Sequence, residues 1–370
     1  MKVALVYDRV NKVGGAERVL LALHEIWPDA PLYTSVYDKK GAPWAKVFNI
    51  HTSFMQQIPL ARKHHELFPW LTPLAFESFN FDDYDIVISI TSAEAKGIIT
   101  KPKTVHICYC LTPTRYLWHD KNIYDNIQIG GFFSFLITPL KKLAAINLRL
   151  WDQVASSRPD YYLSISREVS KRIEKYYQRK SEIIYPPVDC TKFIPAEQKN
   201  RNYFLLVSRL VPYKKVDLAI NALNNLGQKL IIIGRGVEEN NLRKLAKENI
   251  HFITEKLTDG ELIGYYQGCR ALIFPALEDL GLTPLEAMAC GKPVIAYKEG
   301  GVLETVVEGK TGEFFFPQTA KSLEDKIRNF AEDRYQGLDC QVQAQKFNHL
   351  LFKEKFKQAV DNIYLNKNLT

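Results

Sequence analysis

Short apolar runs alternate with longer amphipathic segments along much of the chain, and this alternation restricts its fold more than any other feature. The rhythm is clearest in the second half. The predicted strands there are 203–207, 230–233, 250–253, 271–274 and 293–296, and the predicted helices between them are 216–226, 238–247, 259–267 and 284–289. This order is typical of parallel βαβ units in an open α/β sheet.

The first half begins in the same way and then becomes irregular. We expect strands at 3–7, 86–90, 104–109 and 161–164 and a helix at about 16–26. Residues 51–80 and 110–150 are aromatic, basic and interrupted by prolines, and loops this long are usually functional.

Two adjacent prolines, Pro186 and Pro187, predict a stiff extended joint, with a linker over 186–200. A length of 370 residues also suits two domains. We therefore expect two doubly wound, Rossmann-like domains, residues 1–188 and 189–346, facing across a cleft. Ligands bind at the carboxyl ends of the strands in such sheets.

The composition excludes several protein classes. With 46% hydrophobic and 24% charged residues, the chain is neither disordered nor collagen-like. Its 6 cysteines lack the spacing of a disulfide framework or a zinc site, which favours a reducing cytoplasm. The first residues form a short apolar run ending at Asp8, so we expect no signal peptide, and no apolar run reaches the ~18 residues of a membrane-spanning helix.

The net charge is +8, and most of it lies in the first half. Residues 1–188 contain 24 basic and 18 acidic residues, a difference of 24 − 18 = +6. Such a bias suits nucleic acid or an anionic membrane, although a solvated basic surface without a partner is an open alternative. Because no nucleic-acid module is recognisable, we predict no nucleic-acid partner.

Two stretches, 58–71 and 132–151, mix cations with large apolar side chains. Both would suit an interfacial surface that rests on anionic lipid headgroups and admits a lipid-linked acceptor. The alternative is that these aromatic loops pack against the first sheet.

The segment from Pro275 to Ala296 predicts a strand, an acidic glycine loop, a helix and another strand. Glu278 falls in the loop and Glu286 inside the helix. Backbone N–H groups at a helix N-terminus suit a diphosphate, and a carboxylate beside them can accept hydrogen bonds from sugar hydroxyls. A purely structural explanation for Glu286 is a capping box, with Thr283 as N-cap and Pro284 as first helical residue.

These residues resemble the signature of the family 4 glycosyltransferases, retaining enzymes of the GT-B fold. The similarity extends to residues 208–215, 300–306 and 309–312 and is tightest from 203 to 316. The resemblance implies that Arg209 and Lys214 bind the donor diphosphate, that Glu278 contacts the donor sugar and that Glu286 contacts the ribose. It also implies that the first domain binds the acceptor, the second binds the donor, and a helix over about 347–370 returns to the first domain.

The residue chemistry agrees with these roles. Arg209 and Lys214 follow a buried strand, and a diphosphate needs about two cations to replace its water and counter-ions. Taken alone, this spacing would more often mark a solvated loop. We predict Glu278, Arg209 and Lys214 as the catalytic set. The expected donor-binding residues are Gly14, Gly15, Gly234, Gly281, Leu282, Thr283 and Glu286.

The glycines Gly14 and Gly15 follow the first strand and are expected to leave a helix N-terminus uncovered. They do not form a Gly-x-Gly-x-x-Gly fingerprint, so we predict no nicotinamide or flavin cofactor. A lone Gly-x-Gly at Gly234 proves little, but resembles the family's nucleotide-side turn.

Residues 105–119 resemble a mannosyltransferase-like subgroup of the family, with one departure. The subgroup carries a histidine before Thr-Pro, where this chain has Leu111. The imidazole's contribution is lost or supplied by a neighbour, for which the candidates are Tyr109, Thr112, Arg115 and His119. Tyr109, Thr112 and Arg115 are our acceptor-side predictions, whereas His106 is expected to be a packed core histidine.

A divalent metal could be chelated by the Asp-x-Asp of Asp83 and Asp85. These acids precede a strand and so lie away from the expected cleft, and cations already serve the diphosphate. We predict no metal. Cys108 and Cys110 alternate along a strand without a second pair, so they are not expected to bind one either.

Together these observations predict a retaining hexosyltransferase that moves a hexose from a nucleotide-sugar to a glycan or lipid-linked acceptor. GDP-mannose is the best candidate donor. We expect a cytoplasmic protein, peripheral on the inner face of the membrane. The alternatives are a UDP-hexose-dependent transferase, a nucleotide-sugar epimerase, and a non-catalytic nucleotide-sugar-binding partner of another transferase, the last suggested by Leu111.

Overall fold

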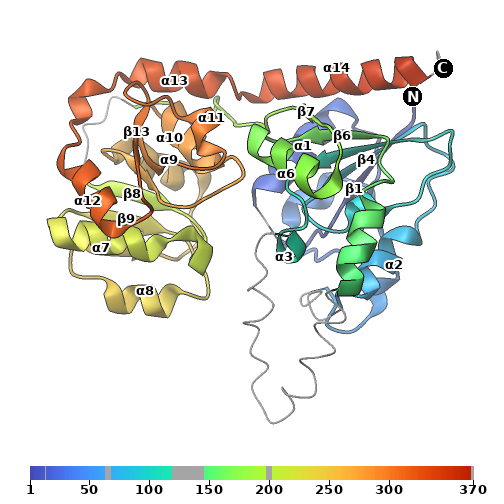
Figure 1. The fold of residues 1–370 in the computed structure, drawn as a ribbon, viewed down its shortest axis with the longest axis horizontal. Coiled ribbons are helices and arrows are strands. Elements are labelled where there is room, and N and C mark those ends of the chain that lie inside the picture. Colours follow the sequence, from blue (N-terminus) through green and yellow to red (C-terminus); the bar gives the residue numbers. More distant parts are fainter. Residues whose placement is uncertain (13, 63–67, 119–145, 197–201, 368–370) are drawn as a thin grey trace, which may run out of the picture. The chain divides into compact units, whose positions relative to one another are not determined.

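The computed structural model describes residues 1–370 except for 13, 63–67, 119–145, 197–201 and 368–370. The chain divides into two compact units, residues 1–185 with 353–370 and residues 186–352. Each unit contains one parallel sheet with helices packed around it (Figure 1). His119 and most of the aromatic stretch from 132, for which predictions were made, lie outside the described residues.

The sheet of the first unit is fully parallel, with the strand order β3-β2-β1-β4-β5-β6-β7. Its strands are β1 (Val3–Tyr7), β2 (Leu32–Thr34), β3 (Ile50–Thr52), β4 (Ile86–Thr91), β5 (Val105–Cys110), β6 (Tyr161–Ser164) and β7 (Glu182–Ile183). Strands β1, β4 and β5 are buried along their whole length, as expected for a parallel sheet covered on both faces.

The helices of this unit are mostly short. They are α1 (Gly15–Ile26), α2 (Leu71–Glu77), α3 (Arg115–Trp118) and α6 (Arg167–Tyr177), with 3₁₀ helices η1 (Pro43–Val47), η2 (Phe54–Gln57) and η4 (Ala95–Gly97). Residues 146–155 are also helical. Helix α6 begins at a serine cap, because the Ser166 hydroxyl accepts a 3.1 Å hydrogen bond from the Val169 N–H.

The sheet of the second unit repeats the same topology, with the order β10-β9-β8-β11-β12-β13. Its parallel strands are β8 (Phe204–Val207), β9 (Leu230–Ile233), β10 (Ile250–Ile253), β11 (Leu272–Phe274), β12 (Val294–Tyr297) and β13 (Gly312–Phe315). Sheet growth reverses direction between β8 and β11. The loops after these two strands therefore flank a topological switch point, where doubly wound sheets bind ligands.

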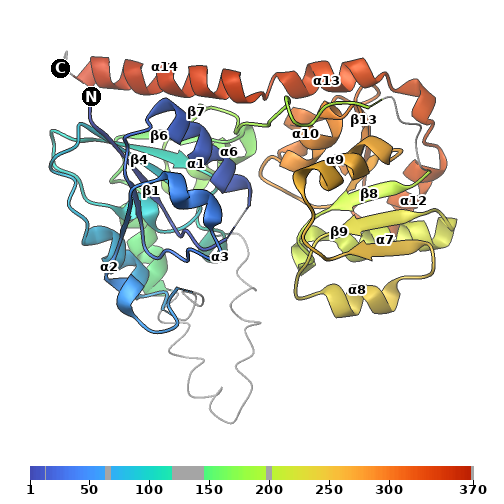
Figure 2. The ribbon, with the colours of Figure 1, turned by 180° about the vertical axis from the view of Figure 1, so that it is seen from behind.

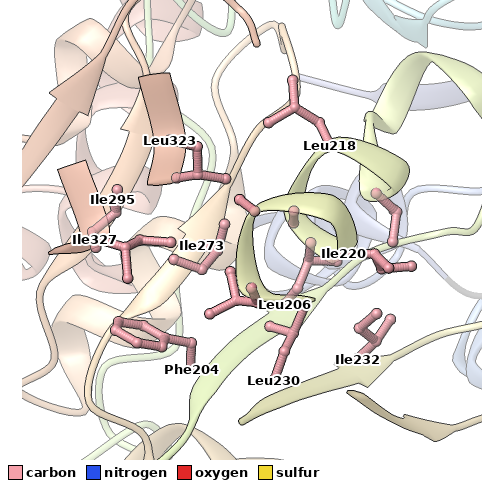
Figure 3. Packing of buried hydrophobic residues seen from close by; sticks show 14 of the residues in the cluster. Phe204, Leu206, Leu218, Ile220, Leu230, Ile232, Ile273, Ile295, Leu323 and Ile327 are labelled. Carbon is pink, nitrogen blue, oxygen red and sulfur yellow. The ribbon is translucent and has the colours of Figure 1, made fainter. Parts of the chain in front are cut away.

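Helices α7 (Val216–Leu226) and α12 (Ala320–Arg328) pack beside each other in the core of this unit. Figure 3 shows Ile220 of α7 and Leu323 of α12 with the strand residues Ile232, Ile273 and Ile295. All five are buried, and truncating such a side chain to alanine costs about 2–5 kcal/mol. The other helices are α8 (Glu239–Leu245), α9 (Asp259–Gly268), α10 (Leu282–Ala289), α11 (Val302–Thr305), α13 (Gly337–Gln345), η5 (Pro212–Lys214) and η6 (Glu332–Arg334).

The last helix, α14 (His349–Lys367), belongs to the first unit from Lys353 onward. Its Phe356 ring is fully buried and lies 5.2 Å from the ring of Tyr109 and 6.2 Å from that of Trp27. Lys353 adds a 2.8 Å ion pair with Glu25 of α1. In both views α14 runs beside the part of the first unit that holds α1 and β7 (Figures 1 and 2).

Candidate active site

Two loops at the carboxyl edge of the second sheet bring a lysine and a glutamate together. Lys214 ends the short helix η5 in the loop after β8, and Glu278 lies in the loop after β11. Lys214 Nζ and Glu278 Oε1 form an ion pair, and the two side chains are only 12% and 19% exposed. The sequence predicted both residues at this edge, and the structure brings them into contact.

Arg209 lies on the same loop as Lys214 and is exposed. Its guanidinium donates a hydrogen bond to the hydroxyl of Tyr213. The two predicted diphosphate-binding cations thus share one loop, and Lys214 is the one that forms the ion pair with Glu278.

The Gly-x-Gly turn after β9 packs against this loop. A Cβ atom at Gly234 would lie 1.8 Å from the Ser208 carbonyl oxygen, and one at Gly236 would lie 2.1 Å from that of Leu210. The Leu210 N–H donates a 2.9 Å hydrogen bond to the Arg235 carbonyl. These glycines therefore permit contact with the chain's own backbone, a structural reason for their presence beside the predicted contact with a ligand.

A second glycine turn, Gly300-Gly301, holds the loop of Glu278. The Gly301 N–H donates a 2.9 Å hydrogen bond to the Glu278 carbonyl. A Cβ at Gly300, where φ is +80°, would lie 2.6 Å from that same oxygen. Side chains at these positions would push the loop away, so the turn fixes the backbone from which the Glu278 carboxylate projects.

Helix α10 begins two residues earlier than predicted. Gly281 is its N-cap and Leu282 its first residue, so Thr283 and Pro284 both lie inside the first turn. The structure therefore excludes the alternative explanation of Glu286, a capping box with Thr283 as N-cap. The physical reason is the backbone at Gly281, which suits only glycine because its φ is +85° and a Cβ there would lie 2.8 Å from the Phe274 ring.

Glu286 is buried and bonded to a residue that the sequence patterns did not single out. The hydroxyl of Tyr266, at the end of α9, donates a 2.6 Å hydrogen bond to Glu286 Oε2. Tyr266 is itself fully buried and its ring stands edge-on to Phe193, with centroids 5.8 Å apart. No sequence pattern links these positions, since they lie 20 residues apart on different helices.

The glycine loop of the first unit differs from the expected open helix N-terminus. Gly14 is the N-cap of α1, but the Glu17 carboxylate bends back toward it, 3.0 Å from where a Cβ would stand. Glu17 also accepts a 3.0 Å hydrogen bond from the Tyr7 hydroxyl, and burial raises the pKa of Glu17. Glu17 lies in the first turn of α1, and an acid at this position is the sequence feature that could have predicted its contact with the helix N-terminus.

The segment that follows β5, residues 111–118, contains Thr112 and Arg115 and is bonded to a buried ion pair. Asp152 is fully buried and pairs with the equally buried Lys96 of η4. Its carboxylate also accepts hydrogen bonds from Thr114 Oγ1 and Trp118 Nε1, both at 2.7 Å, and from the Tyr177 hydroxyl at 2.9 Å. A carboxylate with this many donors holds residues 114–118 at the carboxyl edge of the first sheet.

The three predicted acceptor-side residues lie in different environments. Tyr109 is fully buried, and its hydroxyl donates a 2.7 Å hydrogen bond to the Ile184 carbonyl, so it is a packing residue and we drop it from the acceptor set. Thr112 is buried, and its hydroxyl has no hydrogen-bond partner within the described part of the chain. Arg115 begins α3, next to the Asp152 network, and is partly exposed.

His106 is buried in β5 with its Nε2 2.8 Å from the Ser89 hydroxyl oxygen. Burial lowers its pKa to about 3, which keeps the ring neutral. This environment is that of a packed core histidine, as the sequence predicted. Leu111, at the end of β5, is partly exposed and donates its N–H to the Thr91 carbonyl at 2.8 Å.

The acids before β4 make contacts at the amino edge of the first sheet. Asp85 accepts a 2.7 Å hydrogen bond from the Lys2 N–H, and Asp82 pairs with Lys101. Over the residues that the structure describes, no group of three or more His, Cys, Asp or Glu side chains is arranged to hold a metal ion. None of the described helices combines the length and hydropathy that a membrane span requires.

A hollow in the second unit lies away from these residues. It is lined by Gly291, Lys292, Pro293, Glu332, Asp333 and Tyr335. Residues 291–293 precede β12, so the hollow is at the amino edge of the sheet, opposite to Lys214 and Glu278. The carboxyl edge remains the candidate site.

Residues 189–347, which include both signature glutamates and both cations, match the family model described as "Glycosyl transferases group 1". The matched range covers most of the second unit, residues 186–352. An uncharacterized glycosyltransferase of Methanocaldococcus jannaschii is 25% identical over 225 residues, which is 60% of this chain and 63% of that protein. A GDP-mannose-dependent α-(1-6)-phosphatidylinositol monomannoside mannosyltransferase of Mycolicibacterium smegmatis is 33% identical over 160 residues, 35% of this chain and 42% of that one.

The similarity to solved structures extends over both units. The crystal structure of HepE from Anabaena in complex with UDP matches with a TM-score of 0.68 at 18% identity and covers 98% of this chain and 100% of that one. This match confirms the predicted GT-B fold class, with two Rossmann-like units. The chain spans about half the length of the curated relatives it matches.

Proposed function

We propose that this protein is a group 1 glycosyltransferase that moves a hexose from a nucleotide-sugar to a glycan or lipid-linked acceptor, with retention of configuration and without a metal or cofactor. The observation that carries the proposal is the contact of Lys214 with Glu278 at the switch point of the second sheet. A cation and an acceptor for hydroxyl groups thereby lie together where parallel sheets bind ligands.

Different residues bind different parts of the donor. Lys214 and Arg209 neutralise the diphosphate as it departs, and the backbone N–H groups of Gly281, Leu282 and Thr283 contribute partial positive charge at the start of α10. Charge that develops on the leaving group is stabilised by donors already in place, so little reorganisation is needed in the transition state.

The two glutamates recognise the sugar parts of the donor. Glu278 accepts hydrogen bonds from hydroxyls of the transferred hexose and orients it, and Glu286 accepts from the ribose. Gly234 contacts the nucleotide side of the donor. The first domain, with Thr112 and Arg115, binds the acceptor, which attacks on the face that the leaving group vacates.

Two donors are supported by different observations. The Mycolicibacterium relative is named as GDP-mannose-dependent, and residues 105–119 resemble a mannosyltransferase-like subgroup, which favours GDP-mannose. The similarity to HepE, solved with UDP, favours a UDP-hexose as the second candidate. Nucleoside diphosphate release from each donor, with and without a mixed lipid extract as acceptor, tests both. Release from neither GDP-mannose nor a UDP-hexose would contradict the proposal.

A non-catalytic nucleotide-sugar-binding role is the alternative that Leu111 suggests. Restoring histidine, Leu111→His, discriminates between the two functions. A large gain in sugar transfer by Leu111→His, from near zero in the unaltered protein, would favour the non-catalytic role. Substantial transfer by the unaltered protein would exclude that role.

An anionic membrane surface is the proposed partner of the first unit, on the cytoplasmic side. Ile146, Leu150 and Val154 recur every four residues along the helical segment 146–155 and are 52%, 59% and 61% exposed. An apolar stripe of this kind, together with the basic bias of residues 1–188, suits lipid headgroups that carry the acceptor. Binding to vesicles of anionic lipid tests this part of the proposal.

A further inference from the structure

We propose that Glu278 makes the donor site select a nucleotide that still carries its sugar over the free nucleoside diphosphate. The carboxylate does so by pairing with Lys214 whenever no sugar hydroxyls occupy it. This inference rests on the proposed function, because it assigns the ion pair a second role within the same site.

The ion pair belongs to two loops whose backbones are fixed. The Lys214 N–H donates a 3.0 Å hydrogen bond to the Val211 carbonyl, and Glu278 is held by the 2.9 Å bond from Gly301. Both side chains are largely buried, with exposures of 12% and 19%. A pair with little exposure is screened less by water and salt than one on the open surface.

The ion pair weakens the binding of a free nucleoside diphosphate. To reach the Lys214 ammonium, its phosphates must displace the Glu278 carboxylate or share the cation with it. In both cases the phosphates lie close to the Glu278 carboxylate, and this carboxylate gains no new hydrogen-bond donor. Repulsion between such charges near a protein surface changes an affinity by about tenfold.

A nucleotide-sugar offers the carboxylate a replacement. Its neutral hydroxyl groups donate hydrogen bonds to Glu278, and hydrogen bonds to a charged acceptor are stronger than those between neutral groups. The ammonium is then released to the diphosphate, so each member of the pair gains a partner. Once the hexose has been transferred, the carboxylate loses its donors and returns to Lys214, which favours departure of the nucleoside diphosphate.

The next residue in the loop supplies a matched control. Asp279 carries the same charge and is also partly exposed, so Asp279→Asn removes one negative charge from this loop and leaves the pair of Glu278 with Lys214 in place. We would titrate GDP, GDP-mannose, UDP and UDP-glucose into the unaltered protein, Glu278→Gln and Asp279→Asn by calorimetry. Melting temperatures without ligand establish that each variant is folded, and Glu278→Ala replaces the glutamine variant if that one is not.

We expect Glu278→Gln to bind the nucleoside diphosphate about tenfold more tightly and the corresponding nucleotide-sugar equally or more weakly. The ratio of the two dissociation constants should thus shift by at least about tenfold, and Asp279→Asn should leave it unchanged. An unaltered ratio in Glu278→Gln, with binding intact, overturns this inference alone. Failure of the unaltered protein to bind any of the four nucleotides overturns the proposed function as well.

Discussion

The Tyr266 hydroxyl donates a 2.6 Å hydrogen bond to Glu286, and both side chains are almost fully buried. The contact joins the end of α9 to the middle of α10 and fixes the orientation of the second signature glutamate. A buried carboxylate that loses such a donor keeps its desolvation penalty without compensation.

Removing only the hydroxyl, in Tyr266→Phe, should therefore weaken donor binding and lower the free energy of unfolding by about 1–3 kcal/mol. Tyr203→Phe is the matched control, because its hydroxyl donates a 2.8 Å hydrogen bond to a backbone carbonyl, that of Tyr265. Calorimetric titration with a nucleotide-sugar and denaturant unfolding measure the two effects. Equal donor affinity in both variants would refute a positioning role for Tyr266.

Substitution of Gly300 should impair donor binding as much as substitution of the charged site residues does. Alanine at Gly300 combines a φ of +80° with a Cβ placed 2.6 Å from the Glu278 carbonyl oxygen, whereas alanine at Gly309 has a similar φ of +75° and nothing within 4 Å. Both variants lose about 1 kcal/mol of stability to the left-handed backbone. Only Gly300→Ala should also displace the acidic loop and lose most of its donor binding, as measured by titration and unfolding.

The sequence predicted most strands of the two sheets because these strands are short, mostly apolar and separated by loops. Helix 216–226 and strand 230–233 were predicted with the bounds that the structure has. The short strands β2, β3, β7 and β13 were not predicted, and neither were helices α2, α3, α6, α11, α12 and α13. Three-residue strands such as β2 carry too little periodicity to be distinguished from loop.

The site was harder to predict wherever tertiary contacts override local preference. The capping-box pattern of the sequence favours Thr283 as the N-cap, but the observed N-cap is Gly281. The left-handed backbone at this position and the nearby Phe274 ring leave room only for glycine. The bond between Tyr266 and Glu286 and the pair of Lys96 with Asp152 join positions that only the fold brings together. Tyr109 lies on a strand like a site residue, but its side chain points into the packing around Phe356.

Acid should destabilise the protein partly through His106. Its pKa is lowered to about 3 by burial, so between that value and the ordinary value near 6.5 only the unfolded chain takes up the proton. Stability is therefore present above about pH 6.5 and is lost as the pH falls, by up to about 1.4 kcal/mol per pH unit. His106→Gln should flatten this slope and the exposed His251→Gln should not, in unfolding experiments from pH 7 to 4.

Membrane binding should depend on the apolar stripe of the helical segment 146–155. Leu150→Glu places a charge where an apolar side chain is 59% exposed, and should reduce binding to phosphatidylglycerol-containing vesicles severalfold at low salt. Leu338→Glu makes the same change at a leucine that is 69% exposed in the second unit, and should have no effect. If the unaltered protein ignores these vesicles, the membrane proposal fails.

The donor site itself is tested most directly by turnover of a nucleotide-sugar after removal of either member of the ion pair. Lys214→Ala and Glu278→Ala, shown to be folded by circular dichroism, should each lose at least about 100-fold in kcat/KM, because each removes a group that acts on the reacting donor. The neighbouring substitutions Lys215→Ala and Asp279→Ala alter similar charges on the same two loops and should retain activity. Turnover by Lys214→Ala or Glu278→Ala at the level of the unaltered protein would contradict the proposed donor site.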